Sequence, residues 1–350
     1  MTARVALSVG CPCGVGPEVS VAAAASRRPE RALLVGDFGA IAAAARGRGV
    51  SVGRLVRVAH PGEAWELDRR RIPVWQPTRD LPARDRRPGA PTRASGAAQL
   101  AWIDAATDLV AAGGADALVT GPVSKEAIVR SGAPGAAAFL GHTEHLQRRL
   151  RAREVVMAFW SPALVTSLAT THLPISRVPR ALTPSLVARG AYWLAWLLSR
   201  VTRRHRSGKP RRIAVASLNP HAGEGGLLGG EERSRIAPGI ERARARLRSA
   251  RIDVEIDGPV PAETAFRLAL AGRWDGVEAM YHDQATIPMK IAGFGDAVNV
   301  SLGLPIVRTS VDHGTAYDRA GSWVADESAM KAAIALAARL VASGGASGGR

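Results

Sequence analysis

Short apolar runs with the length of buried strands alternate with helical segments along the whole chain. A strand buried on both faces is a continuous run of about four to eight apolar residues, and intervening helices join parallel strands. The alternation therefore indicates an α/β fold with a largely parallel sheet. One predicted helix begins near Pro17, a second follows the strand that ends at residue 35, and a third runs from a cap at Ser95 to about Ala112. Further helices are predicted near 183–201, 231–250, 262–271 and 327–342. Predicted strands are Val5–Val9, Ala32–Val35, Ala117–Thr120, Val155–Phe159, Leu164–Ala169, Ile213–Leu218, Val277–Tyr281 and Ile306–Val311.

The size and apolar content of the chain narrow its class. Its 350 residues suffice for two domains, and a hydrophobic content of 47% excludes a disordered chain. The longest apolar stretch, Ala191–Leu198, is too short to span a bilayer. Gly10 and Pro12 interrupt the apolar start where the hydrophobic region of a signal peptide would continue. We therefore expect a cytoplasmic protein without a membrane partner.

The net charge of +17 raises the alternative of a basic nucleic-acid-binding protein. Only four of the 47 basic residues are lysines, and apart from runs at 69–71 and 203–212 the arginines are scattered. The 203–212 run is predicted to be a solvated loop, and the tail from residue 343 is expected to fray. Few aromatic residues accompany the charge, so a compositional bias toward arginine explains it better, and we expect no nucleic-acid partner.

Three histidines follow three of the predicted strands. They are His172 in Ala-Thr-Thr-His-Leu-Pro, His221 in Asn-Pro-His-Ala-Gly-Glu-Gly-Gly, and His282 in Met-Tyr-His-Asp-Gln. Any one of them could cap a turn. As a set they indicate a site built from several loops, and three neutral imidazoles can hold a divalent metal with an open position for substrate.

Two glycine-containing segments and two cysteines also have possible roles in a site. Gly10–Glu18 joins a strand to a helix, where phosphate often binds, but it lacks the dinucleotide and P-loop fingerprints. Gly141-His-Thr-Glu144 is either a docking point for an anion or a hydroxylated substrate, or a capping box with Thr143 near the N-cap. The only cysteines, Cys11 and Cys13, lack Cys-x-x-Cys spacing and are predicted to be ordinary thiols.

Polar residues downstream of His282 have the chemistry of a phosphate clamp. Lys290, Asn299 and Arg308 lie in a glycine-containing polar region. A lysine point charge with a two-pronged guanidinium suits a phosphate group. Because lysine is scarce in this chain, Lys290 and Lys125 carry more information than any arginine, although Lys290 could also be an ordinary surface residue.

These motifs together resemble those of the 4-hydroxythreonine-4-phosphate dehydrogenase family of vitamin B6 biosynthesis, over nearly the full length. The resemblance is carried by Gly10–Glu18, Thr120-Gly-Pro-Val-Ser-Lys125, Gly141–Glu144, Thr171-His-Leu-Pro174, Leu218–Gly226, Tyr281-His-Asp-Gln284 and Arg308–Thr315.

The resemblance implies a two-domain fold like that of isocitrate and isopropylmalate dehydrogenases, with largely parallel sheets flanked by helices. One domain would comprise 1–127 with 300–350, and the other 128–299. It implies a homodimer with the active site at the subunit interface, NAD or NADP as cofactor, and one divalent metal (Zn, Mg or Co). By the motif match, the metal ligands would be His172, His221 and His282, and the substrate contacts His142, Thr143, Lys290, Asn299 and Arg308; no cofactor-binding residue is assigned.

Two positions depart from the family pattern. Cys11 stands where the family usually has an acidic residue, and Trp323 where it usually has a glycine. Both bear on which substrate is used. A related dehydrogenase of a phosphorylated sugar acid, 4-phosphothreonate or 4-phosphoerythronate, is therefore the nearest alternative, and a phosphate acyltransferase is a distant one that the histidine set disfavours.

The implied reaction is metal-dependent oxidation of 4-hydroxythreonine 4-phosphate with loss of carbon dioxide, giving 3-amino-2-oxopropyl phosphate. A metal held by three imidazoles would polarise the alcohol oxygen and stabilise the enolate formed on decarboxylation. A phosphate clamp at the far end would position the reacting carbon.

Overall fold

The computed structural model describes residues 2–26, 30–201, 210–293 and 295–344. The described chain divides into two compact units, and the first contains residues 1–155 and 303–350 while the second contains 156–302. Most of the arginine-rich run at 203–212 and of the tail lies outside the described residues. Within the described part of the chain, no helix combines the length and apolar character that a membrane crossing requires.

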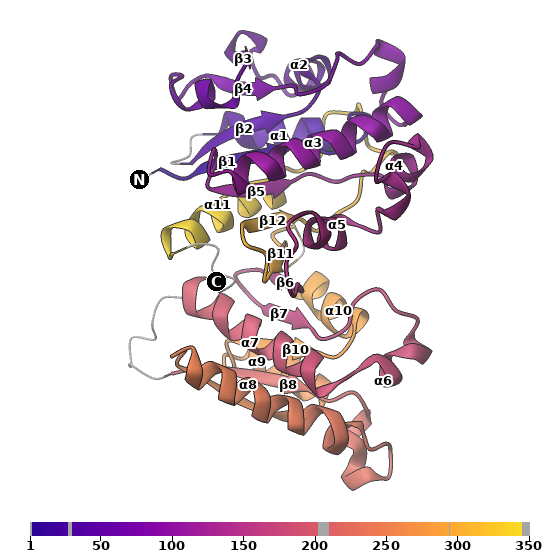
Figure 1. Ribbon diagram of the computed structural model, residues 1–350, viewed down its shortest axis with the longest axis vertical. Coiled ribbons are helices and arrows are strands. Elements are labelled where there is room, and N and C mark those ends of the chain that lie inside the picture. Colours follow the sequence, from indigo (N-terminus) through magenta and orange to yellow (C-terminus); the bar gives the residue numbers. More distant parts are fainter. Residues whose placement is uncertain (1, 27–29, 202–209, 294, 345–350) are drawn as a thin grey trace. The chain divides into compact units, whose positions relative to one another are not determined.

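Unit 1 contains one parallel sheet, drawn from the indigo, magenta and yellow parts of the chain (Figure 1). Its strand order is β3-β4-β2-β1-β5-β12. The central strands are almost wholly buried, as expected for a parallel sheet covered on both faces. The strands are β1 (Arg4–Ser8), β2 (Arg31–Val35), β3 (Leu55–Val58), β4 (Ile72–Trp75), β5 (Ala117–Thr120) and β12 (Val307–Val311).

Polar caps set the starts of several unit 1 helices. The predicted cap at Ser95 is wrong: the helix begins one turn earlier, because Thr92 accepts a hydrogen bond from the Ser95 amide at 3.2 Å and Ser95 Oγ accepts one from the Thr92 amide. The helices are α1 (Gly16–Ala25), α2 (Phe38–Gly47), α3 (Arg93–Ala111), α4 (Lys125–Ser131), α5 (His142–Arg149) and α11 (Ser328–Ala342); the 3-10 turns are η1 (Val52–Arg54), η2 (Pro61–Trp65), η3 (Ala83–Arg86) and η4 (Ala136–Ala138).

Unit 2 has a mixed sheet with the order β11-β6-β7-β10-β8-β9. Strands β7, β10, β8 and β9 are parallel, and β6 is antiparallel to both of its neighbours. The strands are β6 (Val156–Trp160), β7 (Val165–Leu168), β8 (Arg211–Ala216), β9 (Val254–Val260), β10 (Gly276–Ala279) and β11 (Val298–Leu302).

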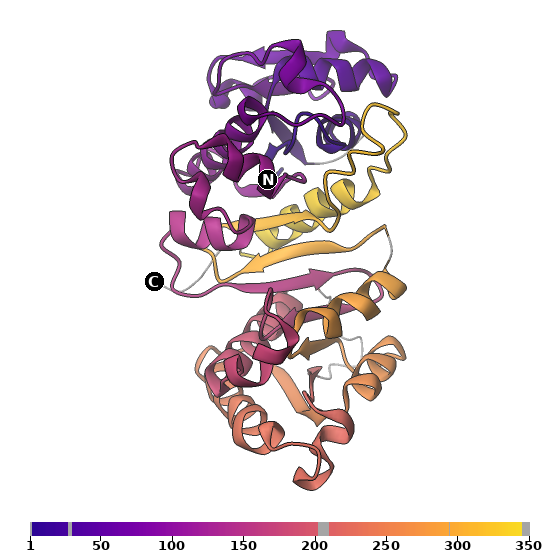
Figure 2. The ribbon, with the colours of Figure 1, turned by 90° about the vertical axis from the view of Figure 1, so that its right-hand side faces the viewer.

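Helices cover both faces of the unit 2 sheet (Figure 2). A core around Phe159, Phe266 and Trp274 seals one of these faces. The helices are α6 (Val178–Ala181), α7 (Pro184–Val201), α8 (Ala237–Ser249), α9 (Ala262–Leu270) and α10 (His282–Ala292); the shorter turns are η5 (Ile175–Arg177), η6 (Pro220–Gly226) and the π-turn η7 (Glu232–Ile236).

The first boundary between the units differs from the predicted one. Residues 128–155 belong to unit 1 rather than to the second domain. Ion pairs tie α5 to α3 there: His145 lies 2.6 Å from Asp104, and Arg149 lies 3.0 Å from Asp104 and 2.5 Å from Asp108. These partners are about forty residues away in sequence, so local pattern did not reveal them.

Candidate functional site

In unit 1, the motifs that begin at Gly10, Thr120 and Arg308 meet at the carboxyl ends of β1, β5 and β12, which are parallel neighbours. The turn after β1 is tied to the turn after β5, because the Cys11 amide donates to the Pro122 carbonyl at 2.8 Å. Gly10 makes this approach possible: its φ is +79°, and a side-chain carbon there would lie 2.2 Å from that carbonyl oxygen. The Val15 amide donates to the Thr315 carbonyl at 3.0 Å, which brings in the loop after β12.

Arg308, a predicted substrate contact, lies on β12 with only 3% of its surface exposed. Its Nη2 donates to Thr120 Oγ1 on β5 at 2.7 Å, which fixes the direction of the guanidinium. Burial lowers the pKa of Arg308 to about 9, and the charge of Glu144 opposes this shift. The side chain therefore remains a cation at neutral pH in a site poor in water, where its attraction to an anion is strong.

His142, the second predicted contact, is the first residue of α5. Burial, followed by the charge of Arg308, lowers the pKa of His142 well below its usual value, so the ring is neutral at physiological pH. Its buried Nε2 has no hydrogen-bond partner among the described residues. A buried polar atom of this kind is costly unless a ligand or water satisfies it. The ring is therefore suited to one hydrogen bond with a bound ligand.

The start of α5 decides between a docking point and a capping box at Gly141–Glu144. The helix begins at His142 with Gly141 at its N-cap, and no side chain caps it. The capping-box interpretation is therefore wrong. Thr143, the third predicted contact, is buried in the first turn. A side-chain carbon at Gly141 would lie 2.9 Å from Glu144 Oε2 and 3.5 Å from Lys125 Nζ, so this glycine makes room for a charged cluster.

Cys11 and Cys13 are buried free thiols in the turn after β1. Cys11 Sγ lies 3.3 Å from the hydroxyl of Tyr317. Hydrogen bonding from Cys13 lowers the pKa of Cys11 to about 7 although burial opposes the shift, and the Tyr317 hydroxyl contributes a further hydrogen bond. The pKa of Cys13 is raised, first by its hydrogen bond to Cys11. Near neutral pH, therefore, one thiol in this turn carries partial negative charge.

A hollow of about 540 Å³ lies beside the same turn. Pro12, Gly14, Arg84, Arg86, Arg87 and Trp323 are among its lining residues. Arg86 is held by Asp37 at 3.3 Å. Trp323 has a φ of +61°, a left-handed conformation that glycine adopts freely, and its ring packs against Gly47. The tryptophan therefore keeps the backbone conformation that suits a glycine and adds an aromatic wall.

In unit 2, the three predicted metal ligands follow β7, β8 and β10, which are adjacent in the order β7-β10-β8. Gln284 joins two of these strand ends, because it accepts from the Met280 amide at 2.7 Å and donates to the Ser217 carbonyl at 2.8 Å. All three histidines are therefore carried on the carboxyl edge of one parallel sheet, where ligand sites of α/β folds are usually found.

His172 and His282 are close enough to share a metal ion. Their ring centres are 5.5 Å apart, and two imidazoles on one tetrahedral ion would have ring centres about 5 Å apart. His282 Nδ1 lies 2.7 Å from Asp283 Oδ1, a carboxylate that can orient the ring. Among the described residues, no group of three or more His, Cys, Asp or Glu side chains is arranged to hold a metal. Two donors thus fit a metal site, and the structure does not bring His221 into their group.

His221 lies in a backbone turn of unusual conformation. Five consecutive residues, 221–225, have positive φ, with values of 51° at His221, 54° at Ala222 and 44° at Glu224. Each non-glycine residue in this region costs roughly 1–2 kcal/mol. Glu232 supports the turn by accepting from the Asn219 amide at 2.8 Å. Such stored strain is typical of functional loops, and it aims an exposed imidazole outward.

The two remaining predicted contacts also belong to unit 2. Lys290 is exposed in the last turn of α10, and Asn299 is half-buried on β11, where it pairs with Phe159. Sequence reasoning missed Thr120, which orients Arg308, and Tyr317, which contacts Cys11. It noted Lys125 but did not place it in the site. The sequence did contain a signal for Thr120 and Lys125, because they are the first and last residues of the motif Thr-Gly-Pro-Val-Ser-Lys.

The profile of the family described as "Pyridoxal phosphate biosynthetic protein PdxA" matches residues 29–337. A 4-hydroxythreonine-4-phosphate dehydrogenase of Geobacter metallireducens is 41% identical over 352 residues, covering 99% of this chain and 98% of the relative. One of Acidithiobacillus ferrooxidans is 41% identical over 349 residues, with the same two coverages.

Solved structures give a similar result. A 4-hydroxythreonine-4-phosphate dehydrogenase from Klebsiella pneumoniae superposes with a TM-score of 0.78 at 31% identity, covering 97% of this chain and 100% of the other. A terephthalate 1,2-cis-dihydrodiol dehydrogenase from Burkholderia xenovorans superposes with a TM-score of 0.63 at 29% identity, covering 98% and 99%.

Proposed function

Because the chain belongs to the 4-hydroxythreonine-4-phosphate dehydrogenase family of oxidoreductases, we propose that it oxidises 4-hydroxythreonine 4-phosphate with NAD or NADP in pyridoxal phosphate biosynthesis. The observation that carries the substrate assignment is the buried pair of Arg308 and His142. It supplies a desolvated cation and a neutral imidazole with an unsatisfied ring nitrogen. A phosphate group satisfies both.

The protein groups have separate roles in the proposed reaction. Arg308 holds the substrate phosphate, with its direction fixed by Thr120, and His142 contributes one neutral hydrogen bond. Thr143, Lys290 and Asn299 complete the contacts we assign to the substrate. Hydride passes from the carbon that bears the hydroxyl to NAD or NADP, and the hydroxyl group loses its proton, which leaves a ketone. Carbon dioxide then leaves, and a proton replaces it to give 3-amino-2-oxopropyl phosphate.

His172 and His282, with His221 as third ligand, are the residues we propose to hold a divalent metal. When bound there, Zn, Mg or Co would supply Lewis acidity at the oxygen that becomes the ketone. The 5.5 Å spacing of two rings and the strained turn at His221 support this set. We further propose that the protein acts as a homodimer with each site completed at the subunit interface.

The hollow beside the turn after β1 is where we propose that the phosphate-bearing part of the nicotinamide cofactor binds. Its arginines can meet the pyrophosphate, and the Trp323 ring offers a stacking surface. Replacing the exposed Arg87 with alanine should raise the KM for the cofactor roughly tenfold, since one charged hydrogen bond is lost, while the KM for the substrate stays unchanged. Initial-rate kinetics with both reactants varied would measure this. Equal effects on both KM values would contradict the placement.

The substrate itself is tested by a panel. NAD(P)H formation should be fastest with 4-hydroxythreonine 4-phosphate, slower with 4-phosphothreonate and 4-phosphoerythronate, and absent with an unphosphorylated cis-dihydrodiol, the substrate class named for the Burkholderia enzyme. A preference for a sugar acid would identify the protein as a related dehydrogenase within the same family.

Cys11 gives this panel a pH dependence. A negatively charged acidic residue, which the family usually has at this position, would attract the amine of 4-hydroxythreonine 4-phosphate. The negative charge of a Cys11 thiolate can partly replace that of the carboxylate. Because the pKa of Cys11 is lowered to about 7, the thiolate is scarce below pH 7 and abundant above it. The ratio of kcat/KM for the amino substrate to that for a sugar acid should therefore rise about tenfold across pH 6–8.

Two substitutions provide the controls for this prediction. Cys11→Asp is ionised throughout the range and should show the high ratio at every pH, whereas Cys11→Ser should show the low one. An identical ratio in all three proteins would mean that Cys11 only fills the turn.

A further inference from the structure

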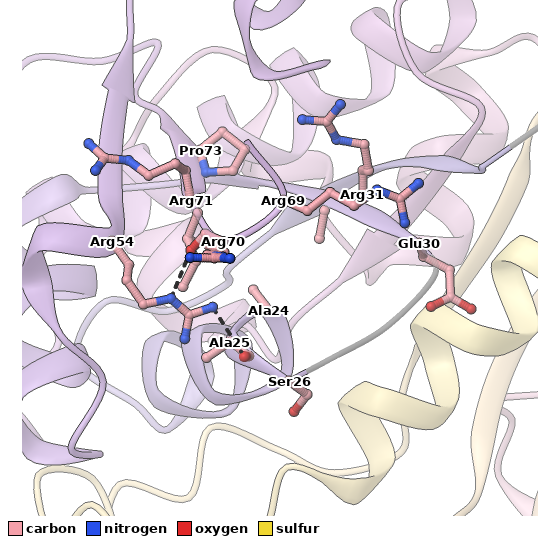
Figure 3. A pocket seen from close by; sticks show the side chains of 12 residues that line it. Ala24, Ala25, Ser26, Glu30, Arg31, Arg54, Arg69, Arg70, Arg71 and Pro73 are labelled. Carbon is pink, nitrogen blue, oxygen red and sulfur yellow. Dashed lines mark hydrogen bonds between the residues drawn. The ribbon is translucent and has the colours of Figure 1, made fainter. Parts of the chain in front are cut away.

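A second hollow of unit 1, of about 640 Å³, is lined by five arginines. They come from three segments: Arg31 at the start of β2, Arg54 before β3, and Arg69, Arg70 and Arg71 before β4. Figure 3 shows these side chains around the hollow, beside the last residues of α1. Arginines from three separate segments thus line a single cavity.

This hollow lies at the opposite edge of the sheet from the candidate site of unit 1. It is formed at the amino-terminal ends of β2 and β4, whereas Arg308, His142 and the turn after β1 gather near carboxyl ends of parallel strands. Neither the proposed reaction nor the proposed cofactor position uses it.

The charge of the hollow is not neutralised by the protein. Arg54 donates to the carbonyls of Arg70 at 2.8 Å and Ala25 at 3.2 Å, and Arg31 donates to main-chain carbonyls of residues 64, 65 and 67. Carbonyl acceptors hold a guanidinium in place but leave its charge. Within the described ranges, none of the five arginines forms an ion pair with a carboxylate, and Glu30 is the only acid in the lining.

The arginine-rich composition of the chain does not by itself account for the excess of arginines over carboxylates in this hollow. A hollow of about 430 Å³ in unit 2 also contains two arginines, Arg244 and Arg248, but three carboxylates accompany them. These are Asp253, Glu255 and Asp257. Arginines at that site are thus balanced locally, whereas five arginines face one acid in the unit 1 hollow.

The lining also indicates the kind of anion. A single phosphate would leave most of about 640 Å³ empty and most of the arginines unused. Ala24, Ala25 and Ala32 are partly exposed and form an apolar wall, and Glu30 has a buried carboxylate oxygen with no hydrogen-bond partner among the described residues. Arg54, Arg70 and Arg71 lie on one side of the hollow and Glu30 on the other (Figure 3).

We propose that this hollow binds a nucleoside polyphosphate. The phosphates meet Arg54, Arg70 and Arg71, a ribose hydroxyl donates to Glu30, and the base lies against the apolar wall or stacks on a guanidinium plane. The inference does not depend on the proposed reaction, because it concerns binding at the other edge of the sheet.

Titration calorimetry with ATP at physiological salt tests the proposal on the full-length protein. Arg70 and Arg71 are exposed and their side chains have no bonding partner among the described residues, so Arg70→Ala/Arg71→Ala should leave the fold intact. We expect one ATP per chain in the wild type, at least tenfold weaker binding in this double variant, and unchanged binding in the matched control Arg244→Ala/Arg248→Ala.

Three results would overturn the proposal. ATP binding that is lost in Arg87→Ala but kept in Arg70→Ala/Arg71→Ala would place the nucleotide in the other hollow. Pyrophosphate binding as tightly as ATP would show that the nucleoside is not recognised, and absence of ATP binding would exclude the site. None of these measurements uses turnover, so a failure here is distinguishable from a failure of the proposed function.

Discussion

Replacing His172 or His282 with alanine should reduce turnover by at least about a thousandfold while leaving the fold intact. Both rings lie at strand ends rather than in the core, and they are 5.5 Å apart. A Lewis acid at the developing ketone is worth several kcal/mol, and about 4 kcal/mol corresponds to a thousandfold in rate. Elemental analysis should show metal in the wild type and its loss in the variants, and circular dichroism should show an unchanged fold.

The matched control is His60→Asn, which removes an exposed imidazole of unit 1 that is not among the proposed metal ligands but keeps a side chain that can cap η2. It should retain full activity and metal content. Chelator should inactivate the wild type, and added Zn, Mg or Co should restore it. Full turnover in a metal-free preparation would exclude the proposed role of these histidines.

Mixtures of the histidine variants can test whether the proposed metal site is completed across the subunit interface. His172 and His282 are neighbours within one chain, and His221 is not grouped with them. If His221 completes the site from the partner subunit, mixing His172→Ala with His221→Ala should restore about a quarter of the wild-type activity after subunit exchange, because half of the dimers then carry one intact site. Mixing His172→Ala with His282→Ala should restore none. Failure of both mixtures would mean that all three ligands come from one chain.

The buried centre of each sheet could be predicted from the sequence, because it consists of short apolar runs. The prediction of a largely parallel α/β fold is confirmed, and the predicted strand at Ala117–Thr120 coincides with β5. The four missed strands carry residues that weaken this signal. Pro73 lies in β4 and Pro259 in β9, β3 contains the exposed Arg57, and β11 contains Asn299. Neighbouring strands, not local propensity, hold these segments extended.

The sequence also indicated which loops carry the site, because polar motifs follow apolar strands. It could not show which side chains meet. Arg308 contacts Thr120 across 188 positions, and Cys11 contacts Tyr317 across 306. Such pairs depend on the order of strands in the sheet, which local periodicity does not specify. The metal-ligand set of His172, His221 and His282 stays a prediction, supported by the neighbouring rings of His172 and His282.

Arg308→Lys should lower kcat/KM for the phosphorylated substrate by roughly tenfold to a hundredfold, the equivalent of one charged hydrogen bond. The guanidinium can donate to Thr120 and to a phosphate oxygen at the same time, in a fixed plane. A lysine ammonium at this buried position keeps the charge but loses this two-pronged geometry. Its charge is also harder to maintain, because burial disfavours the protonated form of lysine. Steady-state kinetics should show a higher KM together with a lower kcat.

Two comparisons separate phosphate binding from damage to the core. Arg130→Lys replaces an exposed arginine that pairs with Glu126 at 3.0 Å, and it should behave as wild type. Inorganic phosphate should raise the melting temperature of the wild type and of Arg130→Lys by the same amount and that of Arg308→Lys by less, because the stabilisation that comes from phosphate bound at Arg308 is lost in this variant. If the substrate analogue that lacks phosphate is used as well as the natural one by every protein, Arg308 does not bind the phosphate group. A buried cation between β12 and β5 would then serve the fold alone, through its hydrogen bond to Thr120.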